Sequence, residues 1–251
     1  FKKNEVALFI VNRGASIYLG GSPELIGTIE NMNNTGKYAL IYIDTVEYDN
    51  NLVIFNSTLP GVAPLRAGES AQLVTVPRYK NALVTNTLSC KEWDPGTGTG
   101  GVLALLVNST LDLQADIDVS EKGFRGADPG VEKYEGSCSS ADPGYSKGLF
   151  TLSAKDSAGF RGEGVIATDF LYPRGRLTAG NGGTGGNARY SGGGGGANSG
   201  SGGKGGFEYN MCGPGGDMGG IKGFSLSSFY DNYDVLYANR IYMGGGGGTG
   251  T

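Results

Sequence analysis

The pattern of apolar and polar positions predicts β-structure along the first part of the chain. A short apolar run extends from Val6 to Val11, and turn residues follow it at 12–14. Further runs rich in Tyr, Ile and Val, which favour strands, cover residues 17–19, 37–46, 52–55 and 71–76. Prolines at 60, 64 and 77 lie between these runs, as expected because proline is excluded from central strands. The pattern predicts a β domain over residues 1–80.

Short apolar runs and very short turns alternate from residue 100 to residue 126. Residues 102–107 read as a buried strand, 108–110 as a turn, and residues 111–119 alternate between apolar and polar. Antiparallel hairpins fit this pattern, and so do coils of a parallel β-solenoid that stack on one another. The motif Gly-Phe-Arg-Gly occurs at 123–126 and again at 159–162, which favours repetition. We expect a solenoid-like region over residues 81–174.

The composition changes at residue 175. The chain has 48 glycines among 251 residues, and many of them fall in residues 180–206 and 244–248. Glycine loses more conformational freedom on ordering than other residues, which would suit a flexible linker. However, Tyr190, Phe207 and Ile221 are interleaved with these glycines and require burial. An ordered glycine-rich segment must pair its main-chain groups, and extended segments of polyproline II type lying side by side do so.

The sequence therefore predicts an all-β fold. Its core is β-solenoid or β-sandwich-like, and a glycine-rich region over residues 175–251 is packed on that core. One short helix is expected over 228–238, with a strand at 240–243, because apolar and aromatic residues recur there near helical spacing. These aromatic residues either anchor the glycine-rich layer or form an exposed patch, whose ligand-binding candidates are Tyr230, Tyr233 and Tyr237.

Charge and composition exclude several functions. The net charge is -4 with no basic cluster, so a nucleic-acid partner is not expected. The chain has no histidine, which removes the commonest general base and argues against an enzyme. No apolar stretch is long enough for a transmembrane helix. A start at Phe1-Lys2-Lys3 is compatible with cleavage of a signal peptide, and an end within a glycine run suggests a fragment of a longer protein.

Acidic residues in turns are the candidates for metal binding and catalysis. No cofactor is expected, although calcium is an option at Asp116, Asp118 and Asp217. Aspartates in turns are also explained by hydrogen bonds to their own backbone. Asp116 and Asp118 with Arg125 are the nearest candidate set for a polysaccharide-active enzyme, but two aspartates two residues apart on a strand more often form a solvated face.

Modification sites complete the candidates. Cys90, Cys138 and Cys212 allow one disulfide with one thiol, or three thiols, and the sequence does not decide the pairing. Thr45, Asn56, Asn108 and Ser157 lie in tripeptides that resemble glycosylation acceptors.

Seven segments follow one another along the chain: 71–79, 83–88, 93–94, 99–105, 122–126, 192–196 and 240–246. In this order they resemble glycine-rich secreted surface proteins of bacteria, notably adhesin-like cargo of the type IX secretion system in Bacteroidota. The resemblance implies an extracellular or cell-surface location and a structural or adhesive role. Its implied partners are surface or matrix glycans or proteins and the secretion machinery. The family has no assigned catalytic residues, and its C-terminal sorting domain is absent from this sequence.

The leading functional expectation is a non-catalytic structural or adhesive module of a bacterial surface or secreted protein. One alternative is a self-assembling subunit of a filament or sheath, hence a homo-oligomer, because open β edges template neighbouring chains. A second is a phage tail-tip adhesin, in which glycine-rich extended helices present variable loops to a host receptor. A third is a polysaccharide-active β-helix enzyme.

Overall fold

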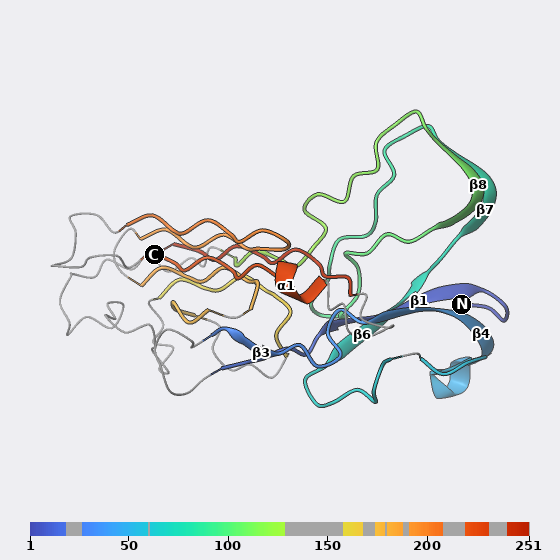
Figure 1. Cartoon of the computed structure of the whole chain (residues 1–251), viewed down its shortest axis with the longest axis horizontal. Helices are drawn as coiled ribbons and strands as arrows, with labels where there is room; N and C mark the ends of the chain where they lie inside the picture. Colours follow the sequence, from blue (N-terminus) through green and yellow to red (C-terminus); the bar gives the residue numbers. More distant parts are fainter. Residues whose placement is uncertain are drawn as a thin grey trace.

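The computed structural model describes residues 1–18, 27–59, 61–128, 158–167, 174–178, 180–187, 191–207, 219–230 and 240–250. Figure 1 shows β-sheets toward one end of the long axis and a set of extended glycine-rich segments toward the other. Helical structure in the described residues is limited to a 3-10 turn at Tyr48–Asn50 and the short α1 at Ser227–Tyr230. The prediction of an all-β protein is confirmed.

The N-terminal residues form a curled antiparallel sheet with the strand order β5-β4-β1-β6 (Figure 1). Its strands are β1 (Val6–Arg13), β4 (Tyr38–Glu47), β5 (Leu52–Phe55) and β6 (Ser70–Thr75). These bounds agree closely with the apolar runs in the sequence. In the register, Leu8 is opposite Leu40 of β4 and Val74 of β6.

The central strand β1 is buried on both faces. Val6, Leu8 and Ile10 contribute to one hydrophobic cluster, which Val102 and Ala104 help to cover. Ala7 belongs to a second cluster on the other face, together with Ala39, Ile41 and Ile43. A strand with two buried faces has no polar positions, which explains why residues 6–11 read as a continuous apolar run. A small pair of strands, β2 (Ser16–Ile17) and β3 (Ile29–Asn31), continues toward the glycine-rich end (Figure 1).

A two-stranded parallel ribbon, which we call the arm, extends from the sheet (Figure 1). It consists of β7 (Arg78–Val84) and β8 (Leu106–Leu113). The alignment of the two segments continues through a bridge between Leu88 and Ile117 and a hydrogen bond from the Trp93 N–H to the Lys122 carbonyl.

The arm corrects the local prediction for residues 100–119. Pairing there is parallel, so antiparallel hairpins are wrong, and the described residues show a curled sheet and a ribbon instead of a solenoid. Residues 108–110, expected as a turn, lie within β8. Val102 and Ala104 cover the sheet outside any strand. A run of apolar residues indicates that these residues are buried. Residues can be buried without being paired in a strand.

The glycine-rich segments form a hydrogen-bonded bundle. We define the glycine bundle as residues 122–127, 158–165, 180–187, 191–198, 200–207, 219–226 and 240–250. Within it, the N–H groups of Gly245 and Gly248 donate to Ala197 and Gly194, and those of Gly246 and Thr249 donate to Glu163 and Phe160. Bonds to one neighbour thus recur at three-residue intervals, the period of a polyproline II helix. The expected side-by-side extended segments are present.

Close main-chain approach explains the glycine content. A Cβ placed on Gly183 would lie 2.8 Å from the Gly195 carbonyl carbon, and one on Gly182 would lie 2.6 Å from the Gly162 oxygen. Both Gly-Phe-Arg-Gly copies lie along residues 244–250: the Phe124 N–H donates to Gly244, and the Thr249 N–H donates to Phe160. The spacing of the two glycines in each copy matches the three-residue period of the bundle.

Candidate functional site

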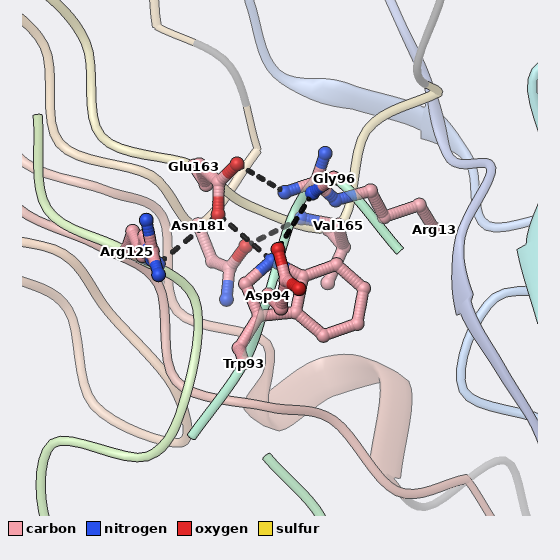
Figure 2. Close-up of polar contacts among 8 residues, drawn as sticks. All are labelled: Arg13, Trp93, Asp94, Gly96, Arg125, Glu163, Val165 and Asn181. Carbon is pink, nitrogen blue, oxygen red and sulfur yellow. Dashed lines mark hydrogen bonds and ion pairs between the residues drawn. The ribbon is translucent and has the colours of Figure 1, made fainter. Parts of the chain in front are cut away.

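A partly buried polar cluster joins the sheet, the segment around Trp93 that follows the arm, and the glycine bundle (Figure 2). At its centre is the Glu163 carboxylate. Oε2 accepts hydrogen bonds from Trp93 Nε1 at 2.8 Å and from the Arg125 N–H at 3.1 Å. Oε1 lies 3.0 Å from a guanidinium nitrogen of Arg13, the last residue of β1. A single carboxylate therefore connects three parts of the molecule.

Aromatic rings complete the surroundings of this ion pair. The Arg13 guanidinium lies 5.1 Å from the centre of the Trp93 ring and 4.9 Å from that of Phe124. The two rings meet edge to face, with centroids 5.3 Å apart. The Arg13 and Glu163 side chains are only 14% and 23% exposed, so solvent screens their attraction weakly. Cation–π contacts add to the attraction, and the cluster holds the segment around Trp93, which follows the arm, against the bundle.

Asn181 performs a similar joining role inside the bundle (Figure 2). Its Oδ1 accepts a hydrogen bond from the Val165 N–H at 2.9 Å, and its Nδ2 donates to the carbonyls of Ala197 and Met243, both at 3.1 Å. The side chain is fully buried. Because its polar atoms are all used, Asn181 fixes three bundle segments without leaving a group free for chemistry.

The sequence did not single out Arg13, Glu163 or Asn181. Their partners are distant in the chain and follow no short motif, so spacing gives no signal. The one available indication is composition: Glu163 and Asn181 are polar residues with larger side chains within glycine-rich stretches. In a region without large side chains, a conspicuous polar residue is a candidate for main-chain pairing.

The predicted metal and catalytic residues do not assemble into a site. Asp116 and Asp118 are exposed beyond β8, and Asp118 Oδ1 accepts a hydrogen bond from the Ser120 N–H at 2.8 Å. Hydrogen bonds from the Ser120 hydroxyl and N–H lower the pKa of Asp118, as in an ordinary aspartate turn. Arg125 instead contacts Glu163 through its backbone. Among the described residues no group of three or more His, Cys, Asp or Glu is placed to hold a metal, and Asp217 lies outside them.

Only part of the aromatic ligand-binding candidates lies within the described residues. Tyr230 is the last residue of α1, while Tyr233 and Tyr237 lie outside the described residues. The neighbouring Leu226 is fully buried, and Phe229 packs on the same cluster. These two side chains anchor the glycine bundle, while the role of Tyr230, Tyr233 and Tyr237 as an exposed patch stays a prediction. The described part of the predicted helix begins one residue early, at Ser227.

The modification candidates occupy different surfaces. Asn56, directly after β5, and Asn108, on β8, are exposed, whereas Thr45 is half-buried with its hydroxyl donating to Asp44. Ser157, Cys138 and Cys212 lie outside the described residues. Cys90 is a half-buried free thiol, and burial raises its pKa.

An apolar groove runs along the arm. It encloses about 500 Å³ and is lined without any charged residue, mainly by residues 79, 81–88 and 103–105. Large apolar side chains on the ribbon are also open to solvent, with Leu83 53% and Leu113 54% exposed. Exposed apolar surface of this kind marks interaction sites.

No protein-family model, curated protein or solved structure matches this chain. Within the described ranges, no helix has both the length and the apolar character needed to cross a membrane.

Proposed function

We propose that this chain is a non-catalytic adhesive module that acts outside the cell, at a cell surface or in a secreted protein. The glycine bundle is the observation that carries this proposal. Its main-chain bonds tie together segments from residue 122 to residue 250. A frame held by backbone pairing tolerates sequence change in the connections between its segments, and binding residues are concentrated in such connections.

The geometry of the bundle points to its end far from the four-stranded sheet as the binding surface. Figure 1 shows the extended segments of the bundle running lengthwise from the sheets toward the opposite end of the long axis. At the sheet end the bundle is held by the contacts of Glu163 with Arg13 and Trp93, so we assign binding to the opposite end.

The chemistry of the described residues supports a binding role over catalysis. The half-buried carboxylate of Glu163 is engaged by Arg13, Trp93 and Arg125. No hydrogen bond or ion pair joins Asp116, Asp118 and Arg125 in the part of the chain that the structure describes. A general acid–base pair needs two groups within reach of one reacting bond, and the exposed aspartates are not arranged in this way.

A phage tail-tip adhesin is the second candidate, and one observation favours it over a solenoid adhesin. Such adhesins present host-recognition loops on glycine-rich extended helices, and the bundle consists of extended segments with the three-residue period. A module of this kind needs one end for loops and another for attachment. The exposed apolar arm, at the sheet end of the molecule, suits attachment.

A binding assay tests the proposal. Labelled protein is incubated with intact bacteria and with a glycan array, in parallel with a variant whose residues 208–218 are replaced by a Gly-Ser segment of equal length. The matched control replaces residues 49–51, in the β4–β5 turn at the sheet end. We expect saturable binding by the wild type and the control, and loss of binding by the 208–218 variant. Absence of binding to every surface would refute the adhesive function.

The same assay separates the two candidates. A tail-tip adhesin binds host bacteria from the outside through one outer-surface receptor, and removal of that receptor abolishes the binding. A module of a bacterial surface protein is instead found on the producing cell, where fractionation and immunolabelling detect it.

A further inference from the structure

We propose that the arm is a self-assembly element, in which β8 of one molecule pairs with β7 of a second copy. The proposal concerns the sheet end of the molecule and is independent of adhesive binding at the far end of the bundle. It rests on the unpaired edges of the ribbon, on its uncovered apolar surface, and on the opposite charges of its two strands.

The ribbon is incomplete as a sheet. β7 and β8 form a sheet of only two strands, so each has one paired and one unpaired side within the described residues. Two-stranded ribbons are marginal alone, and parallel sheets normally have both faces covered. Here most residues of both strands are exposed, and Figure 1 shows the ribbon extending away from the four-stranded sheet and the bundle. Further strands on each side would complete it.

The charges of the two strands indicate that the partner that pairs with the ribbon is a second copy of the chain. Residues 78–91, which include β7, carry Arg78, Lys80 and Lys91 and no acidic residue. Residues 106–121, which include β8, carry Asp112, Asp116, Asp118 and Glu121 and no basic residue. All seven side chains are on exposed residues. On the ribbon itself β7 carries Arg78 and Lys80 and β8 carries Asp112, and the other four residues extend the same charges into the segments that follow the strands. The acidic β8 side of one molecule is therefore complementary to the basic β7 side of the next.

Different interactions determine the affinity of this contact and the choice of which strands pair. Main-chain pairing and burial of residues such as Leu83 and Leu113 supply affinity. Individual exposed ion pairs contribute little to it, but the charge pattern disfavours pairing of β7 with β7 or of β8 with β8. The contact is thus head to tail. Such contacts either close into a ring or continue as a fibre.

Two edge variants test this assembly. In the first, Lys80→Glu with Lys91→Glu makes the β7 edge acidic and leaves β8 intact. In the second, Asp112→Lys with Asp116→Lys removes the acidic character of β8 and leaves β7 intact. Arg78 and Asp118 are kept because Arg78 lies over the Tyr42 ring and Asp118 makes a turn hydrogen bond. The control is Asp49→Lys, on the exposed 3-10 turn.

Light scattering coupled to size-exclusion chromatography measures the outcome, and the fluorescence of Trp93 verifies folding. We expect the wild type and the control to form oligomers, and each edge variant to associate at least about tenfold more weakly. A mixture of the two variants is expected to restore association, because the intact β8 edge of the first variant meets the intact β7 edge of the second. A monomeric wild type overturns the proposal. Oligomers unaffected by both folded variants also overturn it.

Discussion

Substitution of one interior glycine measures how much the bundle depends on close main-chain contact. Gly194 lies in the middle of the bundle, where its N–H donates to Thr184 and its carbonyl accepts from Gly248, both at 2.8 Å. A Cβ at this position would lie 2.6 Å from the carbonyl carbon of Ile221. Carbon atoms prefer separations of about 3.5–4.0 Å, so alanine requires the two segments to separate.

The cost follows from the bonds that such a separation weakens. Two main-chain hydrogen bonds at about 1 kcal/mol each, with a further ~1–3 kcal/mol for overpacking, give a loss of about 3–5 kcal/mol for Gly194→Ala. For a chain of this length each kcal/mol lowers Tm by roughly 2–4 °C, so the decrease is about 10 °C. Gly203 is the matched control: it lies in an adjoining segment, and a Cβ there would meet nothing within 4 Å.

The assay is thermal unfolding followed by the fluorescence of Trp93, the single tryptophan, which lies in the cluster between arm and bundle. Gly203→Ala is expected to leave Tm unchanged or to raise it slightly, since alanine stabilises by about 0.4–1 kcal/mol where its conformation is allowed. Equal Tm values for the two variants would refute the argument that Gly194 is required for main-chain approach.

Three further predictions concern the ion pair of Glu163 with Arg13, the pH dependence of stability, and residues 244–251. Glu163→Gln removes the charge that faces Arg13, so we expect a loss of about 2–3 kcal/mol in urea unfolding; an unchanged midpoint would contradict the role of the ion pair. Burial raises the pKa of Glu69, but hydrogen bonds from Arg66 and Asn34 outweigh it and hold the pKa below 4.5. The stability this carboxylate contributes is therefore present above pH 4.5 and lost as pH falls through its depressed pKa; Glu69→Gln should weaken that acid dependence, and identical pH profiles would count against it. Deletion of residues 244–251 removes a hydrogen-bonding partner from four bundle segments, so limited proteolysis should cut residues 180–207 rapidly in the shortened chain and slowly in the full one; equal rates would show that the segment is dispensable.

Local patterning was sufficient for the strands of the first sheet. Residues 6–11 and 37–46 carry enough β-branched and aromatic side chains to specify β1 and β4 directly. It failed for residues 102–110, because periodicity reports burial and not the identity of the pairing partner. Val102 and Ala104 are covered by packing on the sheet, whereas the polar Asn108 and Ser109 lie in β8.

The glycine bundle was predictable in kind but not in its connections. The need to pair main-chain groups implies neighbouring extended segments, yet glycine runs are interchangeable in sequence and do not specify which of them are adjacent. The polar cluster around Glu163 could not be predicted from the sequence, for a related reason. Arg13, Trp93 and Glu163 come together only through the folded topology, and no local spacing relates them.

The position of residues 244–250 within the bundle has a consequence for biosynthesis. This segment bonds to residues from four other parts of the bundle, the earliest of which is Phe124. During translation those parts are synthesised well before residues 244–250. The N-terminal sheet can therefore fold on the ribosome before the glycine bundle is able to form. Contacts between such distant residues also slow folding. The glycine-rich nascent chain thus remains without its final partners until residues 244–250 have been synthesised, and chaperones that bind it during this interval would protect it from aggregation.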